Sequence, residues 1–182
     1  MKRTKNLVTA LFMSLVLAAC GAAEEEGSQG QPCLPDGSCN PGLLCKNNIC
    51  EEGMFTKIYH SNSFQSCADC HAPAAPGFVD GTETTQNWSS RDNAYDGLQG
   101  NAAGLIGNFE DCNGVPLIGD SPATSLVVAV FDETIRAAFA VSNYPDCTAD
   151  AISDMTLKIG GALSASELTQ LKDWITAGAP DE

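Results

Sequence analysis

Two cysteines and a histidine at fixed spacing are the residues of this chain best suited to chemistry. They form the run Cys67-Ala-Asp-Cys70-His71, a single C-x-x-C-H motif, which is the attachment pattern of covalently bound c-type haem. On a helical turn, two cysteines three positions apart present both sulfurs along one edge of the porphyrin, where they can add across its two vinyl groups. The adjoining histidine then directs its imidazole at the iron. The motif therefore predicts one covalently attached haem c.

A thiol and disulfide redox pair that happens to precede a histidine is the main alternative interpretation of the motif. Pairs of this kind belong to thioredoxin-like folds, in which they occur in a βαβ setting. The residues that flank the motif contain neither a preceding apolar strand nor a βαβ pattern. The sequence thus favours haem over a redox dithiol.

The N-terminus has the pattern of a cleaved secretory signal. A basic stretch at residues 2–5 precedes an apolar run, Leu7 to Ala19, that is too short to span a bilayer as a permanent helix. Its end, Leu17-Ala-Ala-Cys20, is similar to a bacterial lipobox, in which the cysteine is lipid-modified and becomes the first residue of the mature protein. An ordinary signal cut near an Ala-x-Ala site is the alternative. We expect residues 1–19 to be removed and Cys20 to carry the lipid.

Gly21 and the rest of the chain indicate where such a lipoprotein would reside. In these lipoproteins the absence of Asp after the cysteine usually means transport to the outer membrane, where the protein faces the periplasm or the exterior. Haem c is attached outside the cytoplasm, so the export signal and the motif support each other. No later stretch is long and apolar enough to predict a transmembrane helix, so we expect lipid to be the membrane attachment in the bacterial cell envelope.

The charge of the mature chain limits its partners. Residues 1–19 contain three of the nine Lys and Arg and none of the 23 Asp and Glu, so their removal shifts the formal charge from −14 to −17. Such an acidic chain is a poor partner for nucleic acid, whose phosphates attract cations. It would suit a basic redox protein, although acidity also simply keeps a tethered protein soluble.

The remaining cysteines predict disulfides. Six of the nine remain once lipid and haem are assigned, an even number in an exported chain. Four of them crowd into residues 33–50, a stretch rich in turn signals that cannot bury a core of its own: Cys33, Cys39, Cys45 and Cys50. We expect residues 33–50 to form a disulfide-rich knob, similar to small EGF-like or Dickkopf-like modules. Pairing of first with third and second with fourth is our expectation, although sequence alone leaves the connectivity open.

A four-cysteine zinc site is the competing interpretation of the knob. It lacks the paired C-x-x-C knuckles of such sites, and an oxidising compartment favours disulfides. Cys112 and Cys147 are then left to pair with each other across a long loop.

Helical patterns dominate the rest of the chain. Residues 20–32 are polar and glycine-rich, which predicts a flexible tether. Apolar spacing predicts an amphipathic helix over 54–65 that leads into the haem motif. We expect a short helix at Arg91 to Leu98 and one or two helices from Ser121 to Ala140. The clearest helix is the last, in which Ser164-Ala-Ser-Glu167 is a capping box before an apolar stripe.

No alternating strand is evident, so we expect an all-α fold. In it, cytochrome c-like helices would surround a covalently attached haem, with long loops between them and the knob at the N-terminal end. The expected organisation is a signal peptide at 1–19, the tether at 20–32, the knob at 33–50 and a haem domain at 51–182.

Several short segments carry a resemblance to a known family. They are Ile58-Tyr59 before C-x-x-C-H, Asn93-Ala-Tyr95-Asp-Gly-Leu98, Asp120-Ser-Pro-Ala-Thr-Ser125-Leu126, Leu163-Ser-Ala-Ser-Glu167-Leu and Trp174-Ile-Thr-Ala-Gly178-Ala. From about Phe55 to Pro180 the chain resembles monohaem c-type cytochrome domains of exported bacterial proteins. C-x-x-C-H is the most specific part of the resemblance.

The resemblance implies two ligands for the iron. His71 would be the fifth ligand and Met155, which lies shortly before the last helix, the sixth. Family members commonly have Pro after this methionine, whereas Thr156 follows Met155 here. Met155 as a core filler and His60 as a rival ligand are the alternatives.

Two further expectations concern the surroundings of the haem. The His71 ring would donate to a backbone carbonyl near Pro76, and Trp88 or Arg91 would bond to a haem propionate.

The leading functional hypothesis is a lipid-anchored one-electron carrier that exchanges electrons with redox proteins of the envelope. Because two protein ligands would leave no open position on the iron, we expect electron transfer rather than catalysis. The alternatives are a haem-based sensor or small-ligand-binding domain and a cysteine-rich surface-interaction lipoprotein.

Overall fold

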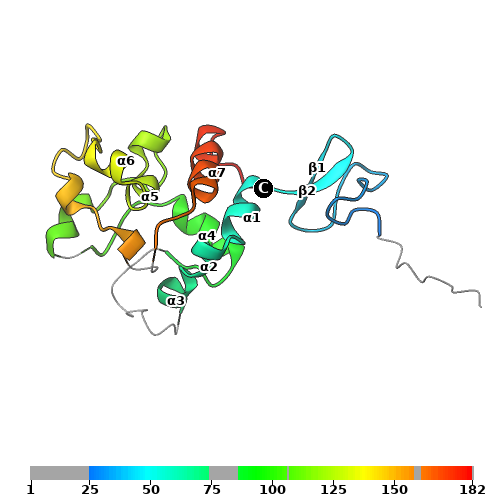
Figure 1. The fold of residues 1–182 in the computed structure, drawn as a ribbon, viewed down its shortest axis with the longest axis horizontal. Helices are drawn as coiled ribbons and strands as arrows, with labels where there is room; N and C mark the ends of the chain where they lie inside the picture. The colour runs from blue at the N-terminus through cyan, green and yellow to red at the C-terminus, as the bar shows by residue number, and fades with distance from the viewer. Residues whose placement is uncertain (1–24, 74–85, 106, 158–160, 182) are drawn as a thin grey trace, which may run out of the picture.

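The architecture is mixed rather than all-α. The structure is a computed structural model that describes residues 25–73, 86–105, 107–157 and 161–181. A two-stranded antiparallel sheet lies at the N-terminal end of the described residues, and short helices joined by loops follow it (Figure 1). The expectation of an all-α, cytochrome c-like fold is therefore wrong. The predicted signal peptide and the predicted lipidation site Cys20 lie outside the described residues.

The strands that the sequence did not predict form a hairpin within and just beyond the knob. Strand β1 (Leu43–Lys46) pairs with β2 (Ile49–Glu52), with Cys45 opposite Cys50. The connecting Asn47 and Asn48 have φ of 52° and 64°, the left-handed conformation that a type I′ hairpin turn requires. Asn tolerates that region better than most residues. The strands lack apolar alternation because disulfides, and not a buried face, stabilise them.

The disulfides have the expected pairing. Cys33 pairs with Cys45 and Cys39 with Cys50. Sulfurs of three of these cysteines lie within 4.8 Å of one another, a spacing that would suit a metal ion. Because all four sulfurs are bonded in disulfides, none is available as a thiolate for zinc.

The polypeptide just before the knob is ordered against it. Gly27 donates its N–H to the Pro32 carbonyl at 2.8 Å and accepts from Asn40 N–H at 2.9 Å. Gly30 N–H donates to the Cys50 carbonyl at 2.7 Å. Residues 27–31 thus form backbone hydrogen bonds with the knob, and residues 20–24 of the expected tether lie outside the described residues.

The helices agree in place with the sequence patterns, although the segments 54–65 and 121–140 are divided into shorter helices. The predicted helix 54–65 is broken at residues 60–61 into α1 (Met54–Tyr59) and α2 (Asn62–Gln65), and α3 (Ala68–His71) follows. Helix α4 (Arg91–Leu98) has the expected bounds. Residues 121–140 contain η2 (Pro122–Thr124), α5 (Leu126–Ala129) and α6 (Glu133–Ala137). The other 3-10 helices are η1 (Gly107–Cys112), η3 (Ala149–Ala151) and η4 (Met155–Leu157).

Helix α7 (Ala165–Thr176) begins at the predicted capping box. The Ser164 hydroxyl accepts from Glu167 N–H at 3.2 Å, and the Glu167 carboxylate accepts from Ser164 N–H at 2.8 Å. The same carboxylate accepts from Ser63 N–H at 3.2 Å and Ser63 Oγ at 3.0 Å. Glu167 therefore ties the start of α7 to α2.

One hydrophobic cluster, here called the aromatic core, lies between α1, α4 and α7. Its largest fully buried members are Phe55, Ile58, Phe64, Leu98, Leu171 and Trp174. The Phe55 and Trp174 ring centroids are 4.9 Å apart, and Tyr95 meets Phe55 edge to face at 5.3 Å. Helices α1 and α7, from opposite ends of the helical region, pack against each other here.

A second cluster, here called the disulfide core, lies around η1, α5 and η3. Its buried members include Cys112, Val115, Ala129, Phe139, Cys147, Ala151 and Ile152. The Cys112–Cys147 disulfide, the pairing expected from the sequence, crosses this cluster. Within the described residues, no helix combines the length and the apolar character needed to cross a membrane.

Candidate functional site

The C-x-x-C-H motif forms a helical turn, as its spacing predicts. Cys67 is the residue before α3, and its carbonyl accepts from Cys70 N–H at 3.2 Å and from His71 N–H at 2.8 Å. Cys67 is buried and Cys70 is exposed. Both are free thiols, outside the three disulfides. The turn thus leaves two sulfurs and an imidazole available next to one another.

An apolar cavity of about 450 Å3 adjoins this turn. Cys67, Cys70 and His71 line it together with Met155, which is more than 80 residues later in the chain. Large apolar side chains form more than half of the remaining wall: Trp88, Leu98, Leu105, Phe109, Leu117, Leu126, Val127, Val130, Phe131 and Ile152. The volume lies within the range of roughly 300–1,000 Å3 typical of cofactor and ligand sites. Segments of both cores contribute to the wall, so the cavity lies between the two cores.

The electrostatics of Cys67 do not match a redox dithiol. Burial raises the pKa of its thiol to about 12, and the neighbouring Cys70 and Asp69 act in the same direction. Cysteines in redox pairs have a lowered pKa, because the thiolate is the nucleophile. In the part of the chain that the structure describes, strands occur only in the hairpin, so a βαβ setting for the motif is not seen either.

His71 has the state that a metal ligand needs. Burial lowers the pKa of its ring, which favours the neutral imidazole. Its Nδ1 is buried and has no hydrogen-bond partner among the described residues. The His71 carbonyl accepts from Trp88 N–H at 2.9 Å, which fixes the backbone of the motif. The predicted carbonyl acceptor near Pro76 lies outside the described residues.

Met155 is the candidate ligand that the fold brings to the same cavity. It begins η4, and its N–H donates to the Val130 carbonyl at 3.0 Å. The rival His60 is exposed at the end of α1, with its Nδ1 3.4 Å from Glu52 Oε1, and is not part of the cavity wall. Of the described methionines, the other is Met54, which packs against the aromatic core.

The two residues expected near a propionate have different positions. Trp88 is buried in the cavity wall, with its ring stacked 5.7 Å from Phe64 and 6.2 Å from Tyr59. Arg91 is not among the described residues that line the cavity. The contact of either residue with a propionate stays a prediction.

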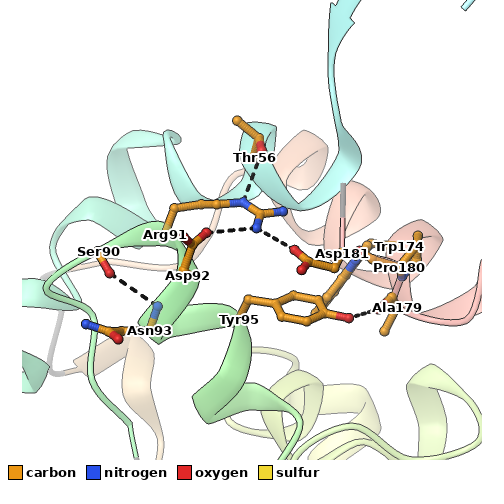
Figure 2. A network of polar contacts seen from close by, with 10 residues as sticks. All are labelled: Thr56, Ser90, Arg91, Asp92, Asn93, Tyr95, Trp174, Ala179, Pro180 and Asp181. Atoms are coloured by element: carbon orange, nitrogen blue, oxygen red, sulfur yellow. Dashed lines mark hydrogen bonds and ion pairs between the residues drawn. The ribbon is translucent and has the colours of Figure 1, made fainter. Parts of the chain in front are cut away.

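Arg91 instead holds the C-terminal residues against the aromatic core (Figure 2). Its Nε donates to Thr56 Oγ1 at 3.3 Å, and its Nη1 bonds to Asp92 and Asp181. Beside it, Tyr95 donates to the Ala179 carbonyl at 3.1 Å. Figure 1 shows the C-terminus beside α1, in agreement with these bonds.

Sequence reasoning missed other residues at or behind the cavity. Gln86 lines it, donates from Nε2 to the Gly97 carbonyl at 2.9 Å, and has an Oε1 without a partner among the described residues. Phe109 lines it while 37% exposed. Arg136 and Asp154 form an ion pair behind Met155. Only Asp154 had a signal in the sequence, its position next to Met155.

Comparison of the chain with known protein families, with curated proteins and with solved structures finds no match. The chemistry of the cavity therefore has to be inferred from its own residues.

Proposed function

We propose that this protein is a monohaem c-type cytochrome that carries one electron at a time between redox proteins of the bacterial cell envelope, to which lipid on Cys20 anchors it. The cavity is the observation that carries the proposal. It joins two free thiols, a neutral imidazole and a thioether in one apolar volume. This is the donor set that a covalently held haem with histidine and methionine ligands requires.

Cys67 and Cys70 would hold the haem covalently. Each thiol adds across one vinyl double bond, with sulfur bonding to one carbon and hydrogen to the other, so the attachment consumes no oxidant. Both cysteines lie outside the disulfides, which leaves their S–H groups for this reaction. The apolar wall suits a flat apolar macrocycle and excludes water from it.

His71 and Met155 would supply the two protein ligands of the iron. Haem provides a centre that gains and loses one electron, and a thioether ligand raises its reduction potential relative to a second imidazole. With both positions taken by side chains, substrate has no access to the iron. That arrangement supports electron transfer between proteins rather than catalysis.

Visible spectroscopy of the purified full-length protein tests the proposal. We expect covalent haem, low-spin bands that carbon monoxide does not alter, and a far-red sulfur-to-iron band. The change Met155→Ala should abolish that band and open the iron to carbon monoxide, because it removes the thioether. Met54→Ala is the matched control and should leave the band intact.

Other outcomes would lead to different functions. A high-spin wild-type protein that binds carbon monoxide would overturn electron transfer in favour of a haem sensor. If the wild-type protein carries no covalent haem when produced with a haem-attachment system, the cytochrome proposal fails entirely. If the wild type carries covalent haem and the double variant Cys67→Ser/Cys70→Ser does not, these two cysteines are the attachment sites.

A further inference from the structure

Met155 lies on an element that is too short to hold itself in place. Helix η4 has three residues, and 3-10 turns of this length have poor hydrogen-bond geometry. The side chain of Met155 nevertheless has to stay at the cavity if it is to bind a metal. Interactions outside η4 must therefore fix its position.

A partly buried ion pair lies next to this element in the sequence and in space. Arg136 Nη2 is 2.8 Å from Asp154 Oδ2, and the two side chains are 13% and 30% exposed. The second oxygen, Asp154 Oδ1, accepts from Thr156 N–H at 3.0 Å and from Thr156 Oγ1 at 2.5 Å. The residues on both sides of Met155 are thus joined through one carboxylate.

The same arginine also contacts the element that Met155 bonds to. Arg136 Nη1 donates to the carbonyls of Ala129 and Val130, each at 3.4 Å. The Val130 carbonyl also accepts from Met155 N–H at 3.0 Å. One guanidinium therefore links the end of α5, which lines the cavity, to the residue next to the methionine.

We propose that Arg136 and Asp154 are positioning residues that hold the Met155 thioether at the cavity for binding to the iron. The inference deepens the proposed function and rests on it. Arg suits this role because its planar fork donates in several fixed directions at once, whereas the single ammonium of Lys cannot reproduce that geometry. The pair acts through backbone placement and does not itself contact the haem iron.

The test is the ligation state of the haem protein. In Arg136→Gln we expect the fraction of protein without the sulfur-to-iron band to rise about tenfold, the change that loss of one charge-assisted hydrogen bond produces in an equilibrium. Carbon monoxide should bind that fraction, and the reduction potential should fall. Arg136→Lys should restore the band in part.

Arg91→Gln is the matched control. Arg91 is also a partly buried arginine paired with an aspartate, Asp181, but it lies away from the cavity wall. We expect this variant to lose stability and to keep the full band. Equal loss of stability in both variants, with the band intact in both, would show that Arg136 only stabilises the fold and would overturn the inference.

If Arg136→Gln does not fold, a milder variant tests whether the ion pair positions Met155. Thr156→Val removes one hydrogen bond to Asp154 and leaves the ion pair. A measurable loss of the band is expected, and an unchanged band and potential would count against the positioning role. Failure of the proposed function is distinguishable, because the wild-type protein itself would then lack the band.

Discussion

The two cores on either side of the cavity are held together by different means. The aromatic core packs large buried side chains such as Phe55 and Trp174 between helices. The disulfide core has smaller side chains, such as Ala129 and Ala151, between short elements that a covalent bond joins. Close packing of large side chains provides most of the stability of a core, whereas a disulfide mainly restricts the unfolded chain. We infer that the aromatic core is the more rigid of the two.

This difference separates the two candidate iron ligands. Cys67 belongs to the aromatic core, so the turn that carries His71 starts from the rigid side. Met155 bonds to Val130, which packs against the disulfide core. We therefore expect perturbations of the aromatic core to affect the whole fold and perturbations of the disulfide core to affect the methionine side first.

The largest expected effect is that of Trp174→Ala in the aromatic core. The side chain is fully buried, contacts Phe55, and donates from Nε1 to the Pro180 carbonyl at 2.9 Å. Truncation of such a residue costs about 3–5 kcal/mol, a large part of the stability of an ordinary domain. Chemical denaturation should show one transition at much lower denaturant. Asp173→Ala, on the exposed side of α7, should change the unfolding free energy by less than about 0.5 kcal/mol.

The next effect should be smaller and local. Cys112→Ser/Cys147→Ser removes the disulfide of the second core, at a cost of about 2–4 kcal/mol. Hydrogen exchange should show lost protection in η1 and η3 while α7 stays protected. Cys39→Ser/Cys50→Ser, which opens the knob, is the control and should leave both regions unchanged. Equal loss of protection in α7 would mean that the two cores unfold as one unit, which would contradict the difference in rigidity inferred for them.

The sequence predicted the parts of this fold that have local signals. The capping box of α7 and the turn of Cys67 to His71 depend on neighbours a few residues away, so their spacing was sufficient. The hairpin lacked the apolar alternation by which strands are recognised, because its strands are held by disulfides. Its remaining signal was Asn47-Asn48, a pair that suits a type I′ turn.

The candidate site likewise could be predicted only where its residues have local sequence signals. Cys67, Cys70 and His71 are adjacent in sequence and were predictable, and Met155 came from a family resemblance. Arg136 reaches Asp154 from helix α6, 18 positions away, and no local sequence pattern predicts such a contact. The bond of Arg91 to Asp181 was not predictable for the same reason, since Asp181 lies 90 positions further along the chain.

The smallest expected loss of stability concerns the aromatic core, where Glu167 joins α7 to α2. Burial raises the pKa of this carboxyl, but the hydrogen bonds from Ser164 and Ser63 outweigh burial and hold the pKa at about 2, below its usual value of 4.5. A lowered pKa in the folded state contributes stability above the unfolded value, and that stability is lost as pH falls from about 4.5 towards 2. Glu167→Gln should therefore cost about 1 kcal/mol at neutral pH, because a neutral amide oxygen accepts these hydrogen bonds more weakly than a carboxylate does.

The pH dependence distinguishes this bond from general acid denaturation. Other carboxyls, including Asp36, Asp132 and Asp154, also have lowered pKa values, so the wild-type protein loses stability in acid for several reasons. The informative quantity is the difference in unfolding free energy between the wild type and Glu167→Gln. Because only the wild type loses the Glu167 contribution, this difference should be constant above pH 5 and shrink as pH falls below about 4.5. If the difference in unfolding free energy does not change with pH, the ionised Glu167 carboxylate does not stabilise the contact between α7 and α2, the helix that precedes Cys67.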